Sequence, residues 1–402
     1  MSEPLQRPPV EDWTTDFDHY APEYIADPYP INDDMREQCP VAHTERYGGV
    51  SVPLTYDLVA EAAHRTDDFT SRRIIISETS TDRRGVVLTP INLDPPHHTA
   101  PRRVMLPFFN PRKVRDWEPA MRAICQERLD AIADQETCDL AADYARHVPG
   151  DVTAAMFGVD PSEGERFRAW IHDLMEVGPT NPAVEARATS EMMGYMVDLV
   201  AERKANGSPV GDDLVTFLLD QDIDGEPIPD DDMAKMLFLL LIAGIDTTWS
   251  ALGHVFLHLA THPEDRRRLA AEPELIPTAT EEFLRAFAPV QVGRIATTDT
   301  EIGGCPVSEG DWVMLNFPAA CRDPEMFEDP DEVIIDRAKN RHAAFGLGVH
   351  RCLGSNLARV EMHIAIEMLL ERIPEFTLVE GHVPSYSGGA VRGPRDVPVV
   401  LG

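Results

Sequence analysis

The sequence predicts a mainly α-helical protein with a minor β region. Apolar residues recur at helical spacing over long stretches, and the longest, from about Asp230 to His262, is apolar on nearly every side and should cross the core. Alternation typical of strands is limited to short segments, the clearest between Val292 and Val313. No linker of low complexity and no internal repeat divides the 402 residues, so we expect residues 1–402 to form a single domain.

The predicted elements begin after a polar, proline-rich N-terminal stretch. Residues 1–40 should wrap the surface, and residues 71–93, which have no clear period, are typical of a long functional loop. The Gly303-Gly304 pair suits the tight turn of a hairpin within the strand-like region. Helices are expected over 56–64, 113–145, 161–177, 184–206 and about 230–262, and short strands over 50–54, 376–379 and 398–401.

The composition excludes several classes of partner. The chain has 36 basic and 69 acidic side chains, a formal net charge of −33, which argues against nucleic acid and anionic membranes. The N-terminus lacks the pattern of a secretion signal, and the apolar run from Met236 to Ile245 is too short to span a bilayer. Six cysteines are scattered without the spacing of a disulfide framework. We therefore expect a soluble cytoplasmic protein.

One short stretch gives the clearest indication of a functional site. Residues 345–354 read Phe-Gly-Leu-Gly-Val-His-Arg-Cys-Leu-Gly. Helical spacing begins just after this glycine-rich loop, so Cys352 should lie near a helix N-terminus. There, unpaired N–H groups and the helix dipole favour a thiolate, which is the axial ligand of some haem irons. The alternative is a buried free thiol. A dinucleotide-binding loop is disfavoured because the third glycine of that pattern is absent.

The middle of the long helix carries residues that an apolar core helix should avoid. Gly244 costs about 1 kcal/mol there, and the carboxylate of Asp246 needs partners if it is buried. The hydroxyl of Thr247 can donate a hydrogen bond to the carbonyl of Ala243 and open the helix locally. This clustering indicates function more than fold. The alternative is a kinked helix whose polar groups are all satisfied.

Two pairs of charged residues lie at helical spacing elsewhere. His98 and Arg102 are one turn apart and could clamp carboxylates, although a solvated basic face is the alternative. Glu282 and Arg285 are three residues apart on a predicted helix, where a surface ion pair is the ordinary interpretation. Neither pair identifies a site by itself.

Taken together and in this order, the motifs resemble those of the bacterial cytochrome P450 monooxygenases over almost the whole length. The likeness rests on Asp94-Pro-Pro-x-His98-x-x-x-Arg102, Ala243-Gly-x-Asp-Thr-Thr248, Glu282-x-x-Arg285, Arg294, Arg337 and the Cys352 loop. A narrower likeness, carried by residues 247–250, 341–345, 352–356 and 388–394, is to haem domains fused to a phthalate-dioxygenase-type reductase. Because this chain ends at Gly402, the resemblance implies a separate ferredoxin and NAD(P)H-dependent ferredoxin reductase, unless the chain is a fragment of a longer fusion.

The resemblance implies the P450 fold, with a long central distal helix over a haem b and a cysteine-ligand loop on its other face. Cys352 would be the axial ligand of the iron, and Asp246 and Thr247 would deliver protons to O2, the co-substrate. The remaining implied roles are haem contacts for His98, Arg102, Ala243, Gly244, Arg294, Phe345, Gly346, His350 and Gly354, and a buried ion network of Glu282, Arg285 and Arg337 that holds the cysteine loop.

The resemblance also indicates an apolar substrate pocket, which favours hydroxylation or O-dealkylation of a small or medium hydrophobic or aromatic molecule. Its lining would include Leu239, Ala243, Pro289, Val290 and Val292. Methionines near Trp170 are expected in the core or in a pocket lid, namely Met175, Met192, Met193 and Met196. An arginine could anchor a carboxylate or simply face solvent, the candidates being Arg72, Arg73, Arg83 and Arg84.

The electron donor should dock on the face nearest Cys352. Basic residues expected there, which would attract an acidic ferredoxin, are Arg103, Arg112, Lys113, Arg115, Arg351 and Arg359. Three alternatives stay open: a peroxygenase, an NO reductase fed directly by NADH, and a non-enzymatic haem sensor. The intact Asp246-Thr247 pair disfavours the peroxygenase and the sensor, because neither needs a proton relay.

Overall fold

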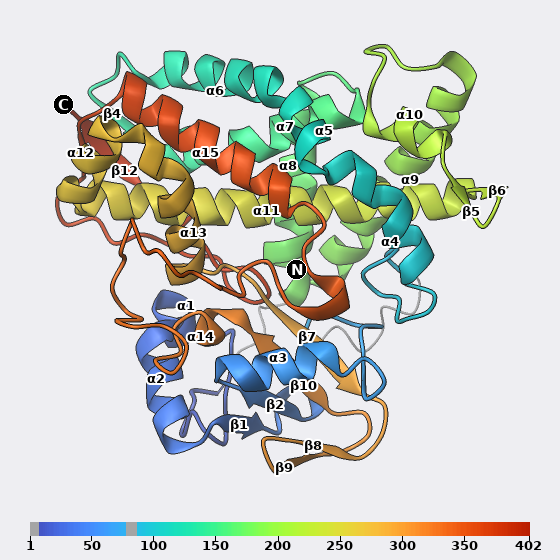
Figure 1. Cartoon of the computed structure of the whole chain (residues 1–402), viewed down its shortest axis with the longest axis vertical. Helices are drawn as coiled ribbons and strands as arrows, with labels where there is room; N and C mark the ends of the chain where they lie inside the picture. The colour runs from blue at the N-terminus through green and yellow to red at the C-terminus, as the bar shows by residue number, and fades with distance from the viewer. Residues whose placement is uncertain (1–7, 78–86) are drawn as a thin grey trace.

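The computed structural model describes residues 8–77 and 87–402, which form a large helical lobe and a smaller lobe that holds the main sheet (Figure 1). The helices are α1 (Pro22–Ala26), α2 (Pro28–Gln38), α3 (Tyr56–His64), α4 (Thr99–Met105), α5 (Pro111–Asp116), α6 (Glu118–Ile132), α7 (His147–Phe157), α8 (Glu163–His172), α9 (Pro182–Asn206), α10 (Leu214–Leu219), α11 (Asp230–Thr261), α12 (Pro263–Ala271), α13 (Ile276–Ala286), α14 (Phe317–Ala320) and α15 (Ser355–Arg372). The strands are β1 (Val41–Thr44), β2 (Val50–Pro53), β3 (Phe69–Thr70), β4 (Thr137–Asp139), β5 (Asp222–Ile223), β6 (Glu226–Pro227), β7 (Gln291–Ala296), β8 (Thr300–Ile302), β9 (Cys305–Val307), β10 (Trp312–Asn316), β11 (Phe376–Leu378) and β12 (Pro398–Leu401). The predicted class, mainly helical with a minor β region, is confirmed.

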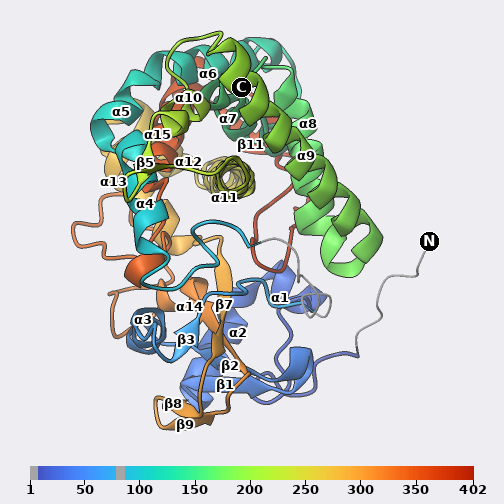
Figure 2. The same ribbon diagram turned by 90° about the vertical axis from the view of Figure 1, so that its right-hand side faces the viewer.

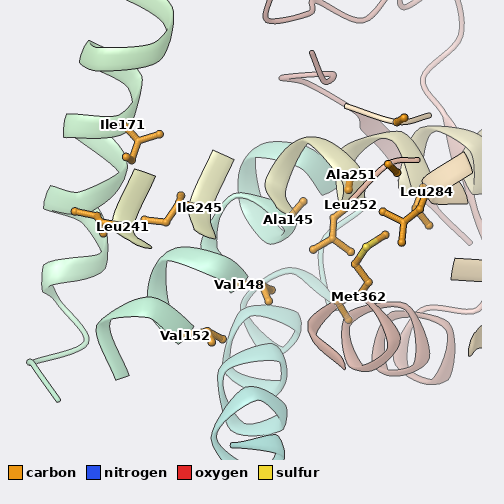
Figure 3. Packing of buried hydrophobic residues seen from close by; sticks show 14 of the residues in the cluster. Ala145, Val148, Val152, Ile171, Leu241, Ile245, Ala251, Leu252, Leu284 and Met362 are labelled. Atoms are coloured by element: carbon orange, nitrogen blue, oxygen red, sulfur yellow. The ribbon is translucent and has the colours of Figure 1, made fainter. Parts of the chain in front are cut away.

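Helix α11 is the axis of the helical lobe, and Figure 2 views it end-on with other helices arranged around it. It spans 32 residues, as its apolar run predicts. Helices α7 and α9 pack along it. Figure 3 shows the resulting core, in which Leu241 and Ile245 of α11 lie near Ile171, while Leu252 lies near Met362 of α15. Because neighbours surround α11, it is apolar on all sides rather than along one stripe.

Helix α11 is also long and apolar enough to cross a membrane by length and composition alone. However, 72% of its most apolar window is buried inside the protein. The core therefore accounts for its hydropathy, as expected for the central helix of a globular domain.

The main sheet has five strands in the order β1-β2-β10-β7-β3. Strand β10 runs parallel to β2 and antiparallel to β7. The predicted hairpin is present between β8 and β9, where Gly303 and Gly304 have φ of +57° and +81°. Both angles lie in the left-handed region that glycine adopts without strain.

Two local expectations are wrong. Within the stretch 1–40, the described residues 8–40 do not merely wrap the surface, because α1 and α2 lie there and Phe17, Tyr24 and Met35 form a second small core with the sheet. Residues 113–145 are not one helix, since α5 ends at Asp116, α6 ends at Ile132, and β4 then pairs with β12. The edge of a distant strand recruits residues 137–139, which local periodicity cannot show.

Two further helical stretches change hydrogen-bond pattern at their ends. The helix expected over 161–177 continues from α8 into a π-helical turn, η5 (Asp173–Val177), and residues 140–145 form a second π-helical turn, η4 (Leu140–Ala145). Within the loop expected over 71–93, residues 71–77 and 87–93 contain no helix or strand. The rest of that loop, with Arg83 and Arg84, lies outside the described residues.

Candidate active site

The cysteine loop owes its shape to two glycines. Gly346 and Gly348 have φ of +71° and +70°. A Cβ on Gly348 would lie 2.3 Å from the carbonyl oxygen of Ala63, so the loop can pack against the end of α3 only with glycine there. The loop is closed by a hydrogen bond of 2.7 Å from the Cys352 N–H to the Phe345 carbonyl. Helix α15 then begins at Ser355, as the periodicity predicts.

The thiol of Cys352 is reached from a large internal cavity but lies deep in the protein. Burial raises the pKa of the Cys352 thiol, against the opposing effects of the Gly354 N–H and the guanidinium groups of Arg102, Arg351 and Arg359. The helix terminus alone therefore does not favour the thiolate, contrary to the expectation from sequence. A metal ion bound to the sulfur would supply the missing positive charge.

The cavity has a volume of about 1360 Å³ and separates α11 from the cysteine loop. All the residues predicted to line a substrate pocket do line it, namely Leu239, Ala243, Pro289, Val290 and Val292. Of the predicted lid, Met175 and Met193 face the cavity, whereas Met192, Met196 and Trp170 are buried in the core. The indole N–H of Trp170 donates to Glu191 at 2.9 Å.

One wall of the cavity gathers cationic and imidazole groups that form no ion pair with a carboxylate of the described residues, although the charge of Asp94 acts on His98 and Arg294. The rings of His98 and His350 lie 4.3 Å apart, and the Nε2 atom of each is buried without a hydrogen-bond partner. Burial, reinforced by Arg294, His98 and Arg102, lowers the pKa of His350 to about 3. Burial likewise lowers the pKa of Arg294 to about 10. Within the part of the chain that the structure describes, the guanidinium of Arg102 donates only to the Arg351 carbonyl.

Two orphaned imidazole nitrogens beside the buried guanidinium of Arg294 and the half-buried guanidinium of Arg102 match an anionic, multidentate partner. The propionates of a haem whose iron lies at Cys352 match this requirement, because both would be held by charge-assisted hydrogen bonds. Phe345, Gly346, His350 and Gly354 also line the cavity around Cys352. The residues present therefore fit a haem.

A buried ion network supports the chain that leads into the cysteine loop. Glu282 and Arg285, both completely buried, form two hydrogen bonds of 2.8 Å, and Arg337 reaches Glu282 at 2.9 Å. Arg285 also donates to the carbonyls of Cys321, Pro330 and Glu332. Every polar atom of the pair is thus engaged, which offsets the cost of burying two charges. The three residues expected to form this network are brought together, and the surface interpretation of Glu282 and Arg285 is wrong.

A second ion cluster beside the first changes the expected docking surface. Arg359 donates to Glu281 at 2.6 Å and stacks over Phe345, and His342 lies 3.1 Å from the same carboxylate. Burial acts to raise the pKa of Glu281, but hydrogen bonds from Arg359 and His342 lower it to about 2. Arg359 is therefore committed to the interior, and Lys113 is paired with Asp212. Neither is a free cation for a partner.

The polar turn of α11 divides between the cavity and the core. Ala243, Gly244 and Thr247 line the cavity, and the Thr247 hydroxyl donates to the Ala243 carbonyl at 2.7 Å, as predicted. The helix nevertheless remains continuous. Asp246 points elsewhere and is 2% exposed. Its carboxylate forms an ion pair of 2.6 Å with Arg395.

Arg395 was not among the residues that sequence reasoning selected. Its guanidinium also forms an ion pair of 2.8 Å with Glu176 in the η5 turn, and it stacks on Trp249 at 4.0 Å. It comes from the C-terminal loop, far from Asp246 in sequence. No spacing rule could have joined them.

Glu361 of α15 is a further residue that sequence reasoning missed. It is 3% exposed, lines the cavity and has the hydroxyl of Thr248 as its hydrogen-bond partner. Burial, only partly opposed by that hydrogen bond, raises the pKa of Glu361 to about 8. The signal was available, because Glu361 falls within the apolar stripe of Leu357, Val360 and Ile364. A carboxylic acid is thus held neutral next to the polar turn of α11.

Comparison with known proteins identifies the family. A family model for Cytochrome P450 matches residues 49–381, so the chain belongs to the cytochrome P450 family. It is a monooxygenase of that family, with haem b as its cofactor and O2 as its co-substrate.

The relatives cover most of the chain. It is 34% identical to Cytochrome P450 107B1 of Saccharopolyspora erythraea, over 83% of this chain and 82% of that protein. It is 33% identical to the mycinamicin IV hydroxylase/epoxidase of Micromonospora griseorubida, over 77% of this chain and 79% of that protein. The structure of CYP109E1 from Bacillus megaterium in complex with testosterone aligns with a TM-score of 0.86 at 28% identity, covering 94% of this chain and 98% of that one.

Replacing Arg285 should release the haem more than it slows the chemistry. Arg285→Ala leaves the Glu282 carboxylate buried without its main partner, which typically costs about 3–5 kcal/mol. We expect purified Arg285→Ala to contain much less haem per chain, with activity per bound haem near that of wild type. Haem content by absorbance is the measurement, and Arg372→Ala, whose ion pairs are exposed and long, is the control. Full haem content in Arg285→Ala would contradict the assigned role.

Glu361 should make stability fall with rising pH. Its pKa is about 8 in the folded protein against 4.5 for an unperturbed glutamate, so between these values only the unfolded chain releases the proton. The free energy of unfolding of wild type should therefore fall relative to that of Glu361→Gln as the pH rises from 4.5 to 8. The expected slope is about 1.4 kcal/mol per pH unit. Urea titrations across this range measure the difference. Glu367→Gln, at an exposed ion pair with Arg122, should run parallel to wild type.

Proposed function

We propose that the enzyme inserts one oxygen atom from O2 into a small or medium hydrophobic or aromatic molecule, by hydroxylation or O-dealkylation. The observation that carries this proposal is that the Cys352 thiol and the Thr247 hydroxyl line the same largely apolar cavity. The haem supplies the centre at which O2 is activated with two electrons and two protons. The surrounding side chains bind, orient and supply protons.

The residues have distinct tasks in this proposal. Cys352 ligates the iron from a loop that Glu282, Arg285 and Arg337 hold in place. The propionates are held by His98, Arg102, Arg294 and His350, two of which have buried nitrogens free to donate. Small side chains at Ala243 and Gly244 leave room for O2. At Gly244 the space is open, because even an added Cβ atom would have the Thr153 hydroxyl as its nearest neighbour, at 3.5 Å.

Proton delivery involves the polar turn of α11. The Thr247 hydroxyl donates to the Ala243 carbonyl in this structure, and rotation about one side-chain bond would turn it into the cavity. Asp246 supplies the proton that Thr247 passes on, and this requires its ion pair with Arg395 to loosen, since the pair otherwise occupies the carboxylate. Positioned proton transfer of this kind contributes about 10²–10⁴-fold to rate.

We further propose that electrons come from a separate ferredoxin and an NAD(P)H-dependent ferredoxin reductase, and that the protein works in the cytoplasm as one P450 domain. With Lys113 and Arg359 removed from the expected surface, Arg103, Arg112, Arg115 and Arg351 remain exposed, and of these Arg103 has a long, exposed ion pair of 3.7 Å with Asp224. These four would attract an acidic partner despite the net charge of −33. Arg392 is one of the residues that carry the narrower likeness to reductase-fused haem domains. Its guanidinium donates hydrogen bonds to the carbonyls of Ile25 and Ala26.

The first test of the proposal is the visible spectrum of the purified protein, reduced with dithionite under carbon monoxide. Ligation by the Cys352 thiolate should give a strongly red-shifted Soret band, and Cys352→His should move that band to the histidine-ligated position. Cys125→Ser, at a buried cysteine away from the cavity, should leave the band in place. A wild-type band at the histidine-ligated position would overturn the proposal.

Thr247→Ala should separate oxygen consumption from product formation. Without the hydroxyl, proton delivery in the cavity is no longer positioned. NADH and O2 should then be consumed while peroxide is released in place of product. The ratio of product to NADH should fall well below that of wild type. Thr261→Ala is a matched control on the same helix, since its hydroxyl also donates to the carbonyl four residues earlier but faces away from the cavity. Unchanged coupling in Thr247→Ala would refute the proton-delivery role.

A further inference from the structure

We propose that Arg72 binds a carboxylate of the substrate, so that the enzyme acts on an apolar acid rather than on a neutral hydrocarbon. This inference rests on the proposed function, because it concerns the same cavity. It begins from the charged groups of the lining. The basic ones are Arg72, Arg73, Arg102 and Arg294, and the acidic ones are Glu185, Asp198 and Glu361.

Three of the four guanidinium groups are already accounted for. Arg102 and Arg294 stand with His98 and His350 at the haem wall, which provides four groups for two propionates. Arg73 has an interaction partner of its own. The guanidinium of Arg72, by contrast, has no ion-pair or hydrogen-bond partner anywhere in residues 8–77 and 87–402. In a chain with almost twice as many acidic as basic side chains, a cavity arginine left without a carboxylate indicates an external anion.

The backbone that carries Arg72 is held from both sides. The N–H of Ser71 donates to Asp94 at 2.8 Å, the Arg72 N–H donates to the Thr70 hydroxyl at 3.2 Å, and Asn92 donates to the Ser71 carbonyl at 3.1 Å. On the other side, the N–H of Gly293 in β7 donates to the Ile74 carbonyl at 2.7 Å. The arginine therefore projects from a fixed segment beside the strand that carries Arg294, so the backbone needs no ordering on binding.

The position of Arg72 relative to the rest of the lining defines the ligand. Arg72 is exposed, which places its charge where the cavity meets solvent, while the walls toward Cys352 are formed by Leu239, Val290 and Val292. A carboxylate can bind the guanidinium through two parallel hydrogen bonds. Its apolar body would then extend inward, and reaction would occur at the end remote from the carboxylate. Glu185 and Asp198 on α9 disfavour an acid on the opposite wall, so the anion has one place to bind.

The test compares acids with their neutral amides in the haem-loaded enzyme. The probes are para-substituted benzoates, such as 4-methoxybenzoate, and medium-chain fatty acids, each paired with its amide, and the dissociation constant is read from the haem spin-state shift at about pH 7.5, where the acids are ionised. We expect at least one acid to bind more tightly than its amide. In Arg72→Gln the affinity for that acid should fall by about 10- to 100-fold, the range for losing a hydrogen bond to a charged group, while the amide is affected little.

Two variants control the test. Arg72→Lys keeps the charge but not the paired geometry and should restore part of the preference for the acid. Arg267→Gln, which removes an exposed arginine on α12 that pairs with Glu375, alters net charge equally and should bind both ligands like wild type. An unchanged preference for the acid in Arg72→Gln, or a panel in which no acid binds better than its amide, would overturn the inference.

Haem measurements separate this inference from the proposed function. Arg72→Gln should keep full haem content and the wild-type spectrum under carbon monoxide, and loss of haem would show instead that Arg72 holds a propionate. If wild type itself lacks the thiolate spectrum, the proposed function fails. Equilibrium dialysis of the same acids against wild type and Arg72→Gln then still decides whether Arg72 binds a carboxylate.

Discussion

The completely buried pair of Glu282 and Arg285 is the interaction on which the active site depends most. A buried carboxylate and guanidinium are costly unless every polar atom is satisfied. Here Glu282 accepts from Arg285, Arg337, Asn340 and the Ile334 N–H, and Arg285 uses its remaining donors on three carbonyls. These groups are satisfied by the irregular segment between α14 and the cysteine loop, which folds around the end of α13. The position of Cys352 follows from that constraint.

The cavity above Cys352 is shaped by a second constraint, the passage of α11 through the core. A helix surrounded by neighbours must be apolar on all sides, and the polar turn around Thr247 interrupts this rule only where the cavity lies. The same turn contacts two acids with different environments. Asp246 is charge-paired with Arg395, whereas Glu361 has only the Thr248 hydroxyl and a pKa of about 8. One acid is thus ion-paired, whereas burial keeps the other neutral, and both lie beside the polar turn of α11.

Local patterns predicted much of the fold and most of the residues that meet in the cavity. The bounds of α3 and α11 and the hairpin at Gly303-Gly304 follow from periodicity and from the conformations open to glycine. Prediction failed where a long-range partner decided the outcome. Residues 137–139 became a strand because β12 offers an edge, and the segment from Phe17 to Met35 became part of a core because the sheet covers Phe17 and Tyr24. The charge of Arg359 gave no sign that Glu281 would pair with it.

The sequence by itself determined the class of the protein through its resemblance to a known family, because a cysteine in a glycine-rich loop, an acid–alcohol pair in an apolar helix and a Glu-x-x-Arg pair are local patterns that can be recognised in order along the chain. Tertiary structure alone decided which charges are paired and which are free. Arg395 reaches Asp246 across 149 residues, Glu361 becomes neutral through burial, and Arg72 is left at the cavity without a partner among residues 8–77 and 87–402. The physical reason is that desolvation and pairing depend on the distance between side chains in space, which the order of residues does not encode locally.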